Sequence, residues 1–151
     1  MKFLLILLVA LLAISAVSAN QCGRFVCLPG HSCIGNKGVW GCHYHCEELV
    51  IEQKVVNNWT DGVNGPASVQ VQVTITNRSH QNIKDIIIAS AVQLNNNQMW
   101  GVDHCTFENG VTLMDLPNYA QGIAPGASYT FGYVARGSSA ANLYVEHILL
   151  M

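Results

Sequence analysis

Five consecutive residues, Cys42-His43-Tyr44-His45-Cys46, contain four side chains that could bind a zinc ion. Structural zinc sites usually take their ligands from two separated pairs, and their thiolates must stay reduced. Four ligands so close together in the chain would have difficulty in closing one tetrahedron. The spacing therefore favours disulfide bonds, with a metal site as the alternative, and we predict no metal or other cofactor.

The chain has six cysteines, and all but Cys105 lie within a short N-terminal segment: Cys22, Cys27, Cys33, Cys42 and Cys46. In an oxidising compartment such a set indicates a disulfide framework. Because the N-terminal group has an odd number of members, complete pairing requires Cys105 to bond back to one of them. The spacing does not choose among the possible pairings.

Acidic residues that could serve a hydrolase are few and fall in expected loops: Asp61, Asp103, Glu108 and Asp115. A glycosidase needs two carboxylates held across a cleft. Asp103-His104-Cys105 has the residue types of a nucleophile site, but three neighbours in the chain cannot form a triad by themselves. We therefore predict that the protein is not an enzyme.

Alternating apolar and polar residues predict the elements that position these side chains. The clearest alternation is in residues 69–76, and further strands are expected at residues 49–59, 83–94, 127–136 and 141–150. In the last of these, Leu143, Val145, His147 and Leu149 alternate. No helix-period pattern occurs beyond the N-terminal apolar run, so the sequence predicts an all-β fold, an antiparallel β-sandwich.

The aromatic residues divide between the two faces of these strands. Trp59 has the strand parity of Ile51 and Val55, which places it on the core side unless the strand ends or bulges first. Trp100 follows an Asn/Gln-rich loop, so we expect it to be exposed. A further set shares one face of a strand and is expected in the core: Tyr129, Phe131 and Tyr133.

The chain divides into three segments by composition. Residues 1–19 have a charged start, an apolar stretch and small residues at the end, as a signal peptide does, so we expect a secreted, extracellular protein with no membrane association after cleavage. Residues 20–46 form a cysteine-rich module, and residues 47–151 form the sandwich domain. The formal net charge is −2 without a basic patch, which argues against nucleic acid as a partner.

Several strings occur in the order found in one family: Asn57-Asn58-Trp59, Met99-Trp100-Gly101, Pro117-Asn118-Tyr119 and Tyr129-Thr130-Phe131-Gly132-Tyr133. Together they resemble the cellulose-binding β-sandwich modules of carbohydrate-binding family 49, which are related to family 2, over about residues 49–149. The cysteine-rich segment resembles small follistatin-like repeats. The whole layout resembles small secreted cellulose-binding proteins of social amoebae.

The resemblance implies that aromatic rings bind cellulose or another β-glucan, a polysaccharide whose flat sugar faces expose C–H bonds. The residues that match the family's binding positions are Trp59, Trp100 and Tyr119. Relatives often have tryptophan at the third position, so Tyr119 should stack more weakly.

The alternative is a structural or adhesive protein whose cysteine-rich module binds an extracellular matrix protein.

Two sequons, at Asn58 and Asn77, predict N-glycosylation of a secreted protein. In a regular strand, neighbouring side chains point to opposite faces. A glycan on an outward-facing Asn58 would then turn Trp59 inward, which counts against a binding role for Trp59.

Overall fold

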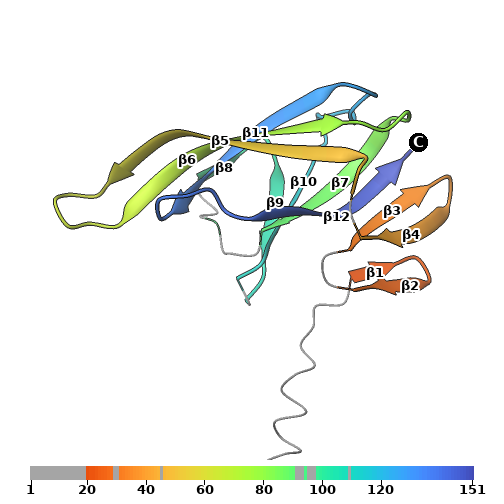
Figure 1. Ribbon diagram of the computed structural model, residues 1–151, viewed down its shortest axis with the longest axis horizontal. Helices are drawn as coiled ribbons and strands as arrows, with labels where there is room; N and C mark the ends of the chain where they lie inside the picture. Colours follow the sequence, from red (N-terminus) through yellow and green to blue (C-terminus); the bar gives the residue numbers. More distant parts are fainter. Residues whose placement is uncertain (1–19, 29–30, 45, 91–93, 95–97, 109) are drawn as a thin grey trace, which may run out of the picture.

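The computed structural model describes residues 20–28, 31–44, 46–90, 94, 98–108 and 110–151. Two sheets face each other across a hydrophobic core, and a small hairpin lies beside one of them (Figure 1). The predicted all-β class, a largely antiparallel sandwich preceded by a disulfide-rich segment, is confirmed. The expected signal peptide lies outside the described residues. Among the described residues, no helix has the length and apolarity that a membrane crossing requires.

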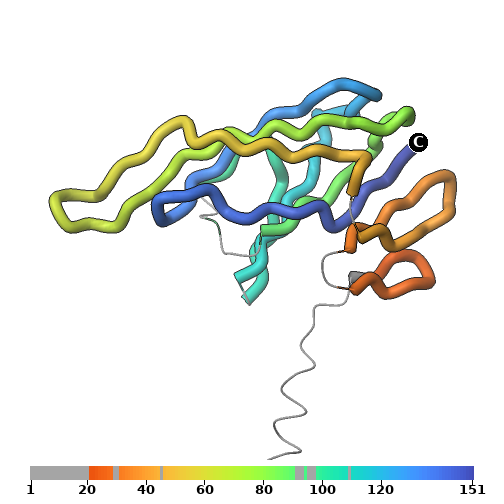
Figure 2. The backbone as a smooth tube through the Cα atoms, in the orientation of Figure 1, coloured from red at the N-terminus to blue at the C-terminus, as the bar shows by residue number. Residues whose placement is uncertain are grey.

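The first sheet has four strands, in the order β5 (Leu49–Thr60), β6 (Ala67–Asn77), β11 (Ser128–Arg136) and β8 (Met99–Trp100). Its inner face is apolar because the alternating residues of β6 and β11 point into the core: Val69, Val71, Val73, Ile75, Phe131 and Tyr133. The long β5–β6 hairpin extends beyond the other strands at one end of the molecule (Figure 2). The predicted core positions of Phe131 and Tyr133 are confirmed.

The second sheet has six strands. Their order is β4 (Val39–His43), β3 (Ser32–Asn36), β12 (Leu143–Leu150), β7 (Ile83–Ser90), β10 (Thr112–Asp115) and β9 (Asp103–Thr106). β3 pairs in parallel with β12, so the cysteine-rich segment extends this sheet. Every other pairing in the sheet is antiparallel.

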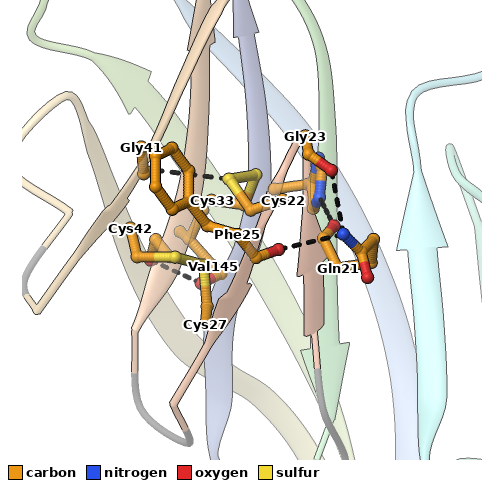
Figure 3. The surroundings of a disulfide bond; sticks show 11 residues. Gln21, Cys22, Gly23, Phe25, Cys27, Cys33, Gly41, Cys42 and Val145 are labelled. Carbon is orange, nitrogen blue, oxygen red and sulfur yellow. Dashed lines mark hydrogen bonds between the residues drawn. A yellow bond between two sulfur atoms is a disulfide. The ribbon is translucent and has the colours of Figure 1, made fainter.

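A separate two-stranded hairpin, β1 (Asn20–Cys22) and β2 (Phe25–Cys27), is tied to the second sheet by two disulfides (Figure 3). Cys22 bonds to Cys33 on β3, and Cys27 bonds to Cys42 on β4. Cys42, one of the four side chains that could have bound zinc, is therefore held in a disulfide.

The expectation that Cys105 bonds to the N-terminal group is wrong. Cys46 and Cys105 are free thiols. Cys46 lies in the segment between β4 and β5, whereas Cys105 lies on β9, and β4 and β9 are the opposite edges of the sheet. Five strand spacings separate these edges, about 24 Å, whereas a disulfide needs Cα atoms within about 7 Å.

The two free thiols should differ in reactivity. Burial, followed by the Glu48 carboxylate, raises the pKa of Cys46 to about 11, whereas Cys105 is exposed. At pH 8 only about a thousandth of Cys46 would be thiolate, the reactive form. We expect iodoacetamide to alkylate native Cys105 long before Cys46, as measured by peptide mass mapping. Equal labelling of the two in folded protein would contradict this.

The alternation expected in the last strand is wrong beyond its middle. A bulge in β12 between Val145 and His147 shifts the register against β7. Val145 points into the core before the bulge, and Ile148 and Leu150 do so after it. His147 and Leu149 therefore leave the face that Val145 occupies, because one extra residue reverses the faces of those that follow.

Three aspartates gather at the β9 end of the second sheet. Burial raises the pKa of Asp115, and the neighbouring carboxylates of Asp103 and Asp85 raise it further. A raised pKa in the folded state means that the ionised form destabilises the fold, so stability is lost as the pH rises through the unfolded and then the folded pKa.

We expect Asp115→Asn to raise the melting temperature at pH 7 by about 1–2 °C, the size expected for relief of like charges across a sheet. The gain should vanish below the ordinary carboxyl value of 3.8. Glu108→Gln, in an exposed loop, provides the control. Calorimetry that shows the same gain at both pH values would refute the electrostatic reason.

Candidate functional site

Trp59 reaches the outer face of the four-stranded sheet because β5 contains a bulge. Val55 lies opposite Val71, but Asn57 lies opposite Gln70, so one extra residue is accommodated at Val56. After this shift Trp59 lies opposite Ser68, whose neighbour Val69 points into the core. A strand without the bulge would have turned the indole inward, as simple alternation predicts.

Trp100 lies on the same outer face, at the opposite edge of the sheet. It pairs with Gly132 in the middle of β11, and its neighbour Met99 pairs with the core residue Tyr133. A Cβ atom placed on Gly132 would overlap Cζ2, Cε2 and Nε1 of the indole, so the ring lies directly over the glycine. The Trp100 side chain is nevertheless 44% exposed, as expected for a ring with one face on the backbone and the other in solvent.

The surface between the two rings is mostly polar. β6 contributes to this face the side chains that alternate with its core residues: Ser68, Gln70, Gln72 and Thr74. We call this outer surface, with Trp59 and Trp100, the aromatic face. By strand geometry the two tryptophan Cα atoms are about 13 Å apart along the strands and about 14 Å across them.

A groove of about 170 Å³ borders the Trp59 end of the aromatic face. It is lined by Trp59, Asp61, Ser68, Gln98, Val134, Ala135 and Arg136. Val134 faces outward yet is only 8% exposed. The groove therefore places hydrogen-bonding side chains of both charges beside an aromatic ring. Arg136 and Asp61 were not expected at the site, because they become its neighbours only through the bulge and the pairing of β11.

Tyr119 lies in the loop between β10 and β11 and is 73% exposed. Its hydroxyl interacts with that of Tyr129. The Tyr129 hydroxyl donates a 2.7 Å hydrogen bond to the carbonyl of Gly101, the residue after Trp100. Burial, then the Tyr119 hydroxyl, raises the pKa of Tyr129 to about 12, so Tyr129 stays a neutral donor at physiological pH. Tyr119 is thus linked through Tyr129 to the backbone of Gly101. Tyr129 lies opposite Ile75 and packs against the core, so these contacts do not place Tyr119 on the aromatic face.

The candidate nucleophile residues do not come together with the aromatic face. Asp103, His104 and Cys105 lie on β9 in the opposite sheet, where Asp103 pairs with Asp115. Asp61 is the acidic residue among those that line the groove beside Trp59. Asp103 and Asp115 line a separate pocket of about 340 Å³ with His104 and Cys105, as directly paired neighbours on adjacent strands of one sheet.

The two sequons have different environments. Asn58 lies on the core side of β5, opposite Val69, yet it is exposed, so a glycan there would not require Trp59 to turn inward. Its glycosylation stays a prediction.

Glycosylation of Asn77 also stays a prediction, and the fold argues against it, because the Asn77 side chain is fully buried. Its amide donates to the carbonyls of Gln81 and Ile123, and its oxygen accepts from Ser79.

The model of one protein family, described as carbohydrate-binding domain CBM49, matches residues 49–137. The chain belongs to the CBM49 family. Its matched region includes β5, β6, β8 and β11, and therefore both tryptophans of the aromatic face. Membership makes this CBM49 protein a carbohydrate-binding protein, and the family is a binding module and not a catalytic domain.

This CBM49 protein is also similar to two proteins of Dictyostelium discoideum over nearly the full length of each. It is 38% identical to stalk-specific proteins B and A of Dictyostelium discoideum, over 96% of this chain and 97% of each relative. Among solved structures, it is similar to the chitinase ChiA74 from Bacillus thuringiensis with a TM-score of 0.49 and 17% identity. That alignment covers 71% of this chain and 16% of the chitinase, and it is too weak to support an argument.

Proposed function

We propose that this CBM49 protein is a secreted, non-catalytic binder of cellulose or a related β-glucan, and that the aromatic face is its binding surface. The observation that carries the proposal is the bulge in β5. It brings Trp59 onto the same outer face as Trp100, across a floor of small and amide side chains. Flat rings on a rigid sheet stack on sugar faces without a large ordering cost at binding.

The third ring of the proposed site is Tyr119, which Tyr129 links to the backbone of the turn after Trp100. At about 1–2 kcal/mol per ring, by analogy with base–aromatic stacking, three rings provide about 3–6 kcal/mol. A single soluble chain would then bind at about millimolar affinity. An insoluble polymer, which offers many overlapping sites, suits such weak contacts.

Two further observations support an extracellular role. Two intrachain disulfides require an oxidising compartment. The similar Dictyostelium proteins are named for the stalk. We therefore propose that this protein acts in an extracellular matrix, wall or coat. We also propose that residues 20–46 form a module whose role differs from the glucan binding of the sandwich.

The test is a depletion assay in which the disulfide-intact protein is mixed with microcrystalline cellulose. Chitin and starch, each in a separate assay, are the control polymers. We expect retention on cellulose and little on starch, whose chain is not a flat ribbon. Retention on chitin alone would replace cellulose with another β-linked polymer. Folded protein that stays in solution with all three would refute the proposed function.

A second candidate, an adhesive role for the cysteine-rich module, is favoured by its exposed apolar side chains: Phe25, Val26, Leu28, Val39 and Tyr44. Exposed apolar side chains that lie together are typical of a protein-binding surface. The partner would be an extracellular matrix protein. Cross-linking on intact matrix, with and without residues 20–46 shielded by an antibody fragment, would distinguish this role from glucan binding.

A further inference from the structure

We infer that Gly132 is a positioning residue that keeps the Trp100 ring flat on the aromatic face, an inference that rests on the proposed function. Gly132 lies directly opposite Trp100 in the β11–β8 pair. Any side chain at this position would start where Cζ2, Cε2 and Nε1 of the indole now lie. These are atoms of the rigid ring, so the ring itself would have to tilt or leave the sheet.

The backbone gives no other reason for glycine at this position. The glycines with a left-handed φ do not include Gly132, so its backbone is open to other residues. A glycine within a strand costs about 0.5–1 kcal/mol relative to alanine and leaves a gap in the sheet surface. Here the indole fills that gap, which identifies the ring as the feature that requires the glycine.

The other side of Trp100 is also fixed. Gly101 follows it with a φ of 79°, a conformation that favours glycine, and a Cβ atom there would lie 3.1 Å from the Cβ of Phe131. The Gly101 carbonyl accepts the hydrogen bond from Tyr129. The backbone on the C-terminal side of Trp100 is therefore held by this turn, while Gly132 sets the plane of the ring.

The same construction occurs a second time in the chain, in a different role. Trp40 on β4 lies opposite Gly35 on β3, and a Cβ atom on Gly35 would also overlap the indole. That ring packs against the disulfide-bonded cysteines, near His147 and the turn at Gly23. Trp40 therefore secures the hairpin, whereas Trp100 keeps an open face for a ligand.

The test compares Gly132→Ala with the matched control Gly41→Ala. Gly41 also lies in a strand, and its nearest obstacle is the end of the His43 side chain at 3.3 Å. In NMR spectra we expect contacts between the Trp100 ring and Gly132 Hα in the wild type. In Gly132→Ala the Trp100 indole signals should shift, while those of Trp59 stay in place. Unchanged Trp100 signals would overturn the inference.

Cellulose binding gives the second readout. We expect Gly132→Ala to bind about 5- to 10-fold more weakly, because a tilted ring loses most of its stacking. The double variant with Trp100→Ala should bind no more weakly than Trp100→Ala alone, since Gly132 acts through the ring. Losses that multiply in the double variant would show an independent role and overturn the inference.

Two further outcomes distinguish the positioning role of Gly132 from an effect on folding and from the proposed function. If Gly132→Ala is unstable because the ring is displaced, adding Trp100→Ala should restore stability, and failure to do so would count against the inference. If the wild type does not bind cellulose but the Trp100 signals still move in Gly132→Ala, the proposed function fails and the positioning role stands.

Discussion

Trp100→Ala is expected to weaken binding to cellulose by about 5- to 30-fold, the loss of one stacked ring at about 1–2 kcal/mol. The ring has one face on Gly132 and the other in solvent, so its removal takes away ligand contact and little core packing. β8 is only two residues long, at the edge of its sheet. The urea midpoint should therefore stay close to that of the wild type.

The matched control for this prediction is Tyr144→Ala. Tyr144 is another partly exposed aromatic residue, 37% exposed, but it lies on β12 in the opposite sheet. Depletion isotherms on microcrystalline cellulose should be unchanged by this control. If both variants lose binding equally, general stickiness of aromatic surface explains retention. If Trp100→Ala unfolds, the ring belongs to the structure and not to the site.

The sequence predicted the sandwich because its signal is local. The alternation in residues 69–76 predicts one buried and one polar face, and β6 has both. The face of Trp59 could not be predicted, because the bulge at Val56 depends on how β5 pairs with β6 and leaves no mark in a two-residue period. The bulge in β12 misled the prediction for His147 in the same way.

Tertiary contacts also determine which cysteines form disulfide bonds. Composition correctly indicated disulfides in the N-terminal segment, but counting to an even number led to a wrong partner for Cys105. The sheet order places β9, which carries Cys105, at the opposite edge from β4, which precedes Cys46, and only the pairing of β3 with β12 reveals this. Short strands such as β9 carry too few residues to show a period.

Asn77 shows most clearly that a glycosylation motif does not reveal whether its asparagine is exposed. The Asn-Arg-Ser string marks it as a glycan acceptor, but the fold uses every hydrogen-bonding position of its amide. Its backbone also bonds to Ala127 and Gly126. One side chain therefore joins the end of β6 to the Gln81 loop and to the turn that precedes β11.

Asn77→Ala is expected to lower the free energy of unfolding by about 3–5 kcal/mol, the largest loss that we predict for a single polar residue. Four side-chain hydrogen bonds, of 2.7–2.9 Å, disappear with it. Each contributes about 1 kcal/mol net, and the loss grows where a buried partner such as the carbonyl of Ile123 is left unsatisfied. The measurement is urea unfolding followed by circular dichroism.

Asn58→Ala is the matched control for Asn77→Ala, because it makes the same substitution at the other sequon on an exposed side chain. It should change the unfolding free energy by no more than about 0.5 kcal/mol. Mass spectrometry of secreted protein should then find any glycan on Asn58 and none on Asn77. A glycan on Asn77, or equal stability of the two variants, would mean that Asn77 is accessible and that the end of β6 is held by other contacts.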